Sequence, residues 1–134
     1  RLSVVAAGLL PLACDAHWRL TKPVPRSGGV YENDPLPPNA NTQEEWVCRH
    51  AQPNPRVPRP TFAAGGTAGI VYGTGAIGHA GDCAVYLSYD LDRPRRSMRW
   101  VKIANLPDCR SQINQEVRIG LPSQLPAGDA GLRW

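Results

Sequence analysis

Proline and glycine restrict the possible folds of this chain more than any other feature of its sequence. Fourteen prolines and thirteen glycines make up a fifth of the 134 residues. Proline lacks a backbone N–H and glycine is costly to order, so both interrupt helices. This composition excludes long helices and suits short strands joined by tight turns. With 42% hydrophobic residues the chain can bury one core of ordinary size, which predicts a single all-β domain.

Alternating apolar and polar residues locate the expected strands. Residues 17–29 alternate before two prolines and a glycine pair, which predicts an N-terminal edge strand that passes into a loop. Residues 30–61 are rich in proline, asparagine and charged side chains, so we expect an irregular segment with little beyond a helical turn near residues 42–48. Further strands are expected at 68–73, 84–90, 99–104, 116–121 and 129–134. Six short strands favour a β-sandwich.

The beginning of the chain has the pattern of an export signal. Arg1 precedes an apolar stretch, residues 2–13, which is too short to cross a bilayer and has the length of a signal-peptide core. Small residues follow, with Cys14 and Ala16 at the minus-three and minus-one positions of a cut after Ala16. We therefore expect residues 1–16 to be a partial signal peptide, and His17 to begin a secreted, extracellular protein. The alternative is a buried N-terminal strand or helix.

The charge pattern gives little support to nucleic-acid binding. The formal charge of +4 comes from thirteen arginines and two lysines that are scattered along the sequence. The densest basic run, residues 93–96, has only a distant aromatic neighbour in Trp100, whereas nucleic-acid interfaces interleave basic and aromatic residues. We interpret this run as a solvated turn. No segment after the leader has the pattern of a membrane span, so neither nucleic acid nor membrane is an expected partner.

Two of the three histidines, His17 and His79, are the candidate metal ligands. Cleavage after residue 16 would free the α-amino group of His17, which could then bind a metal through that amine and its ring Nδ1 together. A second imidazole would complete three nitrogen ligands, and planar, nitrogen-rich sites favour copper. His79 is held in a tight loop, residues 78–83, just before a predicted strand and thus at the rim of a sheet. His50 lies in a proline-rich stretch and is interpreted as a loop residue.

Several segments, taken in order, resemble the copper-dependent lytic polysaccharide monooxygenases. The segment from His17 to Arg26 is similar to the family's initial histidine followed by a proline-containing stretch that ends in arginine. Residues 63–66, 79–83 and 85–90 resemble the family's central segment, which contains the second copper ligand. Residues 100–103, 121–128 and 132–134 resemble its closing strands. The resemblance implies an immunoglobulin- or fibronectin-III-like β-sandwich with long loops.

The resemblance also implies an activity. One copper ion per chain would be held by His17 and His79, and the enzyme would cleave glycosidic bonds oxidatively in chitin, cellulose or another cell-wall glycan. Its partners would be the polysaccharide, an external electron donor, and hydrogen peroxide or dioxygen, with the protein acting as a monomer. Trp18, Tyr31 and Trp46 are candidates for stacking on sugar rings at an exposed, flat rim, although buried structural aromatics are commoner in small sandwiches.

One part of the family pattern has no counterpart here. Members usually carry an axial Tyr or Phe and a nearby Gln or Glu on later strands, so we expect residues 17–134 to form a catalytic domain that is incomplete at its C-terminus. In an exported protein disulfides are the default use of cysteine, and processing would leave Cys48, Cys83 and Cys109. If the partner of Cys48 is missing in the same way, Cys83 and Cys109 remain to pair with each other, although sequence alone does not determine connectivity.

Two other functions stay open. The first is a non-catalytic secreted protein that binds copper through the same histidine brace for uptake or storage. The second is a cell-wall polysaccharide-binding module without a metal. Asp82 and Asp90 are interpreted as turn and strand-end residues, and their spacing does not indicate the acid pair of a glycoside hydrolase.

Overall fold

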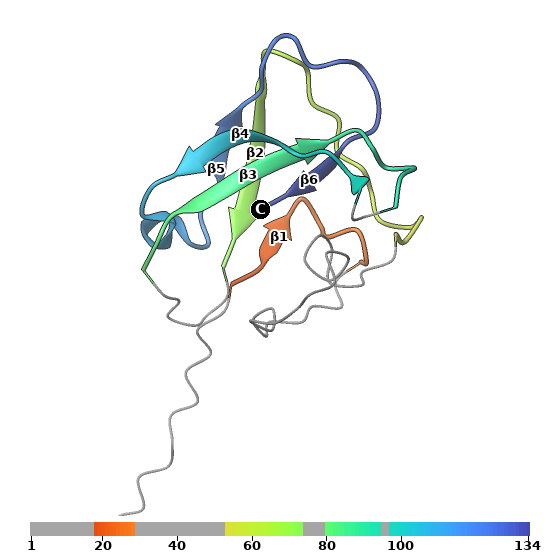
Figure 1. Ribbon diagram of the computed structural model, residues 1–134. Coiled ribbons are helices and arrows are strands. Elements are labelled where there is room, and N and C mark those ends of the chain that lie inside the picture. Colours follow the sequence, from red (N-terminus) through yellow and green to blue (C-terminus); the bar gives the residue numbers. More distant parts are fainter. Residues whose placement is uncertain (1–17, 29–52, 74–79, 95–96) are drawn as a thin grey trace, which may run out of the picture.

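The computed structural model describes residues 18–28, 53–73, 80–94 and 97–134. Within these ranges the elements are β1 (Leu20–Lys22), β2 (Thr67–Tyr72), β3 (Cys83–Ser88), β4 (Val101–Leu106), the 3-10 helix η2 (Cys109–Gln112), β5 (Val117–Gly120) and β6 (Gly131–Arg133). The strands pair antiparallel in two three-stranded sheets, ordered β1-β2-β5 and β4-β3-β6 (Figure 1). The all-β prediction is therefore confirmed.

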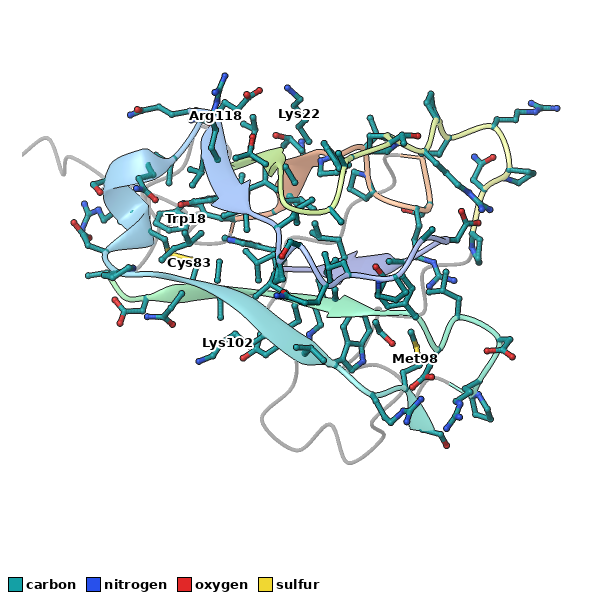
Figure 2. All side chains as sticks on the ribbon, turned by 90° about the horizontal axis from the view of Figure 1, so that it is seen from above. Trp18, Lys22, Cys83, Met98, Lys102 and Arg118 are labelled. Atoms are coloured by element: carbon teal, nitrogen blue, oxygen red, sulfur yellow. A yellow bond between two sulfur atoms is a disulfide. The ribbon has the colours of Figure 1, made fainter. Side chains whose placement is uncertain are left out.

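The core lies between the two sheets. Alternate residues of β2 point inward, so Ile70 and Tyr72 are buried, and Ile119 of β5 lies beside them. Val85 of β3 and Leu106 of β4 belong to the same cluster and come from the other sheet. Figure 2 shows the two layers edge-on with side chains filling the space between them. Burying one side chain of this size contributes roughly 1.5–3 kcal/mol, so packing between the sheets is a major source of stability.

The five later strands lie within two residues of their predicted ranges, and the largest shift is at β4. Strand β3 ends where the backbone N–H of Asp90 donates to Ser88 Oγ, at 3.2 Å. The backbone N–H of Arg99 then donates to Asp90 Oδ2, at 2.8 Å. This bond holds the residues before β4 in a loop, and the strand begins at Val101, two residues later than the alternation predicts.

The N-terminal edge strand is present but short. Leu20 pairs with Tyr72 and Lys22 with Val71, with an irregularity between the two pairs, and Pro23 follows directly. Residues 53–61 contain no helix or strand, in agreement with the irregular segment expected there, whereas the helical turn predicted near residues 42–48 lies outside the described ranges. None of the helical residues that the structure describes forms a segment long and apolar enough to cross a membrane.

Candidate functional site

Most of the residues that the sequence nominates lie outside the described ranges. These are the three histidines, His17, His50 and His79, and two of the candidate stacking aromatics, Tyr31 and Trp46. The third aromatic, Trp18, is half-buried and packs against the core cluster (Figure 2).

The structure describes the chain directly after each of the two proposed copper ligands. His17 precedes Arg19 by two residues, and His79 precedes Gly81 by two residues. Arg19 and Gly81 both belong to one end of the sandwich, where β1 begins, β2 ends and β3 begins (Figure 1). We call this region the disulfide end, because it contains the bond between Cys83 and Cys109.

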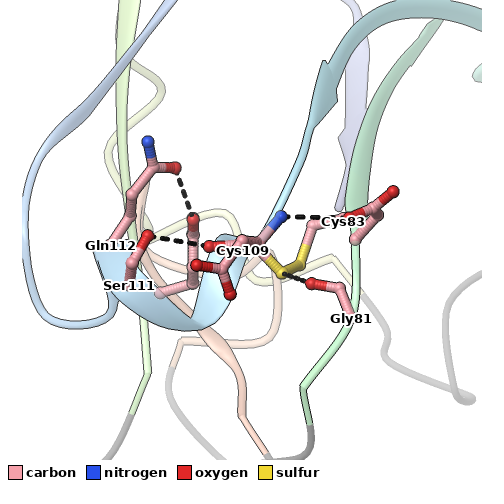
Figure 3. The surroundings of a disulfide bond; sticks show 8 residues. Gly81, Cys83, Cys109, Ser111 and Gln112 are labelled. Atoms are coloured by element: carbon pink, nitrogen blue, oxygen red, sulfur yellow. Dashed lines mark hydrogen bonds between the residues drawn. A yellow bond between two sulfur atoms is a disulfide. The ribbon is translucent and has the colours of Figure 1, made fainter.

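The disulfide joins the start of β3 to the start of η2. Cys83 and Cys109 are linked with their Cα atoms 5.7 Å apart, which confirms the pairing expected from sequence (Figure 3). The backbone N–H of Cys109 also donates to the carbonyl oxygen of Gly81, at 3.2 Å. The two residues before β3 are therefore fixed to η2 by the main chain as well as by the sulfur bridge.

Helix η2 is in turn attached to the end of β2. The hydroxyl of Tyr72 donates to Gln112 Oε1 at 3.2 Å, and the backbone N–H of Asn114 donates to the Tyr72 carbonyl at 2.8 Å. The Tyr72 ring stacks on Trp134, with 4.8 Å between the ring centroids. Burial raises the pKa of the Tyr72 hydroxyl, so this group stays protonated and keeps donating at neutral pH.

Gly73 completes the connection to the start of the chain. Its backbone N–H donates to the carbonyl of Arg19 at 2.9 Å. Its φ of 130° favours glycine, and a Cβ atom there would lie 2.6 Å from Asn114 Oδ1 and 3.1 Å from Asn114 N. A larger residue would therefore separate the end of β2 from the segment after η2.

The residues that connect β1, β2 and η2 at the disulfide end, Gly73, Gln112 and Asn114, were not identified from the sequence. A glycine directly after a strand signals a close approach of two backbones, and this signal could have singled out Gly73. Gln112 and Asn114 carry no comparable signal, because their partners lie far away in the sequence; Gln112 is 40 residues from Tyr72.

The two aspartates considered in the sequence have structural roles, as expected. Asp82 Oδ1 accepts the backbone N–H of Asp108, at 3.0 Å, and so supports the turn before η2. Asp90 accepts three hydrogen bonds from Arg99, two of them from the guanidinium, at 2.9 and 3.0 Å. These bonds, helped by the nearby charge of Arg93, hold the pKa of Asp90 well below its usual range. A carboxylate held ionised in this way cannot serve as a general acid.

The described ranges do not by themselves make up a metal centre. Within them, no three His, Cys, Asp or Glu side chains gather closely enough to hold a metal ion. What they provide is a rigid framework that connects the segments following His17 and His79. No protein-family model, curated protein or solved structure matches this chain.

Proposed function

We propose that this protein is a secreted, copper-dependent monooxygenase that cleaves glycosidic bonds in a polysaccharide oxidatively, with His17 and His79 as the copper ligands. We also propose that its sandwich is of the immunoglobulin or fibronectin-III type. The sheet orders β1-β2-β5 and β4-β3-β6 support this assignment, since they match the A-B-E and C′-C-F strand neighbours of variable-type immunoglobulin domains.

The observation that carries the proposal is the continuous connection across the disulfide end. Arg19 is hydrogen-bonded to Gly73, Tyr72 to η2, and η2 to Gly81. The residues two positions after each proposed ligand therefore belong to one fixed framework. A chelate needs this kind of fixed framework, since a metal site must keep its ligands within a narrow range of positions.

The protein's own contribution is positioning. A free amine and a ring nitrogen of His17, together with the imidazole of His79, would supply three nitrogen ligands, a set that favours copper. Bound copper would supply the redox chemistry with the oxidant. The neighbouring framework is held by backbone hydrogen bonds, by the side-chain bond between Tyr72 and Gln112, and by a disulfide.

The experiment compares four forms of the secreted protein by copper titration calorimetry, and by release of oxidised oligosaccharides with a reductant present. His79→Ala should weaken copper binding by orders of magnitude, because one of three nitrogens is lost. One extra residue before His17 should be equally harmful, because it converts the amine into a peptide nitrogen. His50→Ala should bind copper like the parent.

Each alternative function predicts a different pattern. If all the variants bind copper like the parent, there is no brace, and a metal-free polysaccharide-binding module is favoured. If the parent binds copper and the two brace variants do not, but no polysaccharide yields oxidised products, the protein is a copper carrier.

A further inference from the structure

The outer face of the β4-β3-β6 sheet carries a row of large side chains, one from each strand. Tyr86 pairs with Lys102 on one side and with Arg133 on the other. Residues directly opposite each other in antiparallel strands project to the same face. Because Val85 and Leu132, the neighbours of this row along the chain, pack in the core, the row faces away from it. Figure 2 shows Lys102 on the opposite side of the molecule from Lys22 and Arg118.

Trp100 extends this row into a surface with two aromatic rings. The guanidinium carbon of Arg133 lies 5.8 Å from the ring centroid of Tyr86 and 5.8 Å from that of Trp100. A Cβ atom on Gly131 would lie 3.5 Å from Trp100 Cη2, so the indole rests on this glycine. We call these four residues, Tyr86, Trp100, Lys102 and Arg133, the aromatic-basic face.

The side chains of this face remain partly open to solvent. Tyr86, Trp100 and Arg133 are half-buried, and Lys102 is exposed. Among the described residues, no acidic side chain forms an ion pair with Lys102. In the nearest loop, after β3, Arg93 and Arg99 neutralise the carboxylate of Asp90, and Asp92 is exposed.

This combination fits a polymer that has both flat apolar faces and anionic groups. The C–H face of a pyranose ring packs on an aromatic ring, and a guanidinium or ammonium group pairs with a carboxylate. Two rings beside two cations, spread over three neighbouring strands, give an extended surface. An extended surface suits a chain-like ligand, which can lie across the strands.

We propose that the aromatic-basic face binds a polysaccharide that bears carboxylate groups, and anchors it to the sheet away from the disulfide end. Tyr86 and Trp100 stack on sugar rings and Lys102 pairs with carboxylates, while Arg133 adds positive charge beside the two rings. The proposal rests on the proposed function, because it specifies the class of polysaccharide that the enzyme is brought to. Binding at this face needs neither copper nor reductant, so the two proposals fail independently.

The test measures retardation in native gels that contain either carboxymethylcellulose or neutral hydroxyethylcellulose, without copper or reductant. The parent should be retarded by the anionic polymer. Lys102→Glu should weaken this binding about tenfold, because it places a negative charge opposite the ligand's carboxylates. Arg118→Glu, on the other outer face, is the matched control with the same change in net charge and should stay within about twofold of the parent. Tyr86→Leu, which keeps an apolar side chain but removes the ring, should also weaken binding.

Four outcomes would overturn the proposal. Equal weakening by Lys102→Glu and Arg118→Glu would mean that net charge alone drives binding. No retardation of the parent by carboxymethylcellulose, or equal retardation by the neutral polymer, would remove the need for an anionic ligand. Tighter binding of a single-stranded oligonucleotide, lost in Lys102→Glu, would make this face a nucleic-acid surface. If the parent is retarded by carboxymethylcellulose but releases no oxidised oligosaccharides with copper and a reductant, only the proposed function is refuted.

Discussion

The two outer faces of the sandwich have the same architecture but opposite chemistry. On the β1-β2-β5 sheet the outward residues include Lys22, Glu116 and Arg118, and we call them the charge-paired face. Lys22 forms an ion pair with Glu116, and both Lys22 and Arg118 lower the pKa of that carboxyl. The aromatic-basic face has two rings and two cations instead. Alternation along a strand determines which positions face outward but not which residues occupy them. The two faces therefore differ because different residue types stand at their outward positions.

The charge-paired face satisfies its charges within the protein, whereas the aromatic-basic face has a cation and aromatic rings that a ligand could contact. An ion pair between exposed groups satisfies both charges on the protein itself. Lys102 is exposed and forms no ion pair with a described acidic side chain, so its charge is available for a ligand. Both faces depend on the core that they share.

Removing the Tyr72 side chain, which packs between the two sheets, should have the largest effect on the free energy of unfolding. Tyr72 is fully buried on β2 and stacks on Trp134, which directly follows β6 of the other sheet. Tyr72→Ala should lower the free energy of unfolding by about 3–5 kcal/mol, and Tyr72→Phe, which loses only the bond to Gln112, by about 1 kcal/mol. Urea unfolding measures both. Lys102→Glu changes only an exposed side chain and should hardly alter the free energy of unfolding. If Tyr72→Ala were equally stable, Tyr72 would not be a central part of the core that joins the two sheets.

The disulfide should rank second, and it belongs to one sheet only. Cys83 begins β3, the strand that also carries Tyr86, whereas no described residue of the β1-β2-β5 sheet is bonded in this way. Replacing Cys83 and Cys109 together by serine should cost about 3 kcal/mol, since the bond closes a loop of moderate length. The same loss should follow when the parent is unfolded with a reductant present. Unchanged stability under both conditions would contradict a role for this bond in holding β3 to η2.

The sequence predicts the strands well because their signals are local. In β2, Ala68, Ile70 and Tyr72 alternate with less buried residues as the pattern predicts, and the strand ends at Tyr72, one residue before the end of the predicted range. The start of β4 was misplaced because Asp90 binds Arg99, nine residues further along, and alternation does not record that bond.

The sites are harder to predict because they depend on contacts between distant residues. Tyr86, Lys102 and Arg133 come from three different strands, and only the register places them in one row. For the same reason the contact between Trp100 and Arg133 leaves no signal in the sequence. The disulfide between Cys83 and Cys109 was expected from the resemblance, whereas the framework around it, Gly73 with Arg19 and Gln112 with Tyr72, was not.

The loop next to the aromatic-basic face should show the clearest pH dependence. Hydrogen bonds from Arg99 hold the pKa of Asp90 below its ordinary value, so the folded state favours the ionised carboxylate. This contribution to stability is present above the ordinary carboxyl range, near pH 4, and is lost as the pH falls toward the lower folded pKa. Asp90→Asn should therefore lower the free energy of unfolding at pH 7. It should also make that free energy fall less as the pH is lowered below the ordinary carboxyl range. Asp92→Asn, an exposed change in the same loop, should leave the pH dependence of the free energy of unfolding as it is in the parent.

The smallest effect is expected on the charge-paired face, at Glu116. Its carboxylate is exposed, and Lys22 lowers its pKa through a hydrogen bond and through charge. Such a pair is screened by salt and constrains two flexible side chains, so Glu116→Gln should reduce stability slightly at low ionic strength and not at all at high salt.

The same variant also distinguishes the two faces. Glu116→Gln makes the net charge one unit more positive, so a polysaccharide that responds only to net charge should bind more tightly. Docking on the aromatic-basic face predicts unchanged retardation by carboxymethylcellulose, because Glu116 lies on the opposite sheet. Stronger retardation of Glu116→Gln would show that the two faces contribute alike and that their difference in side chains has no consequence for binding.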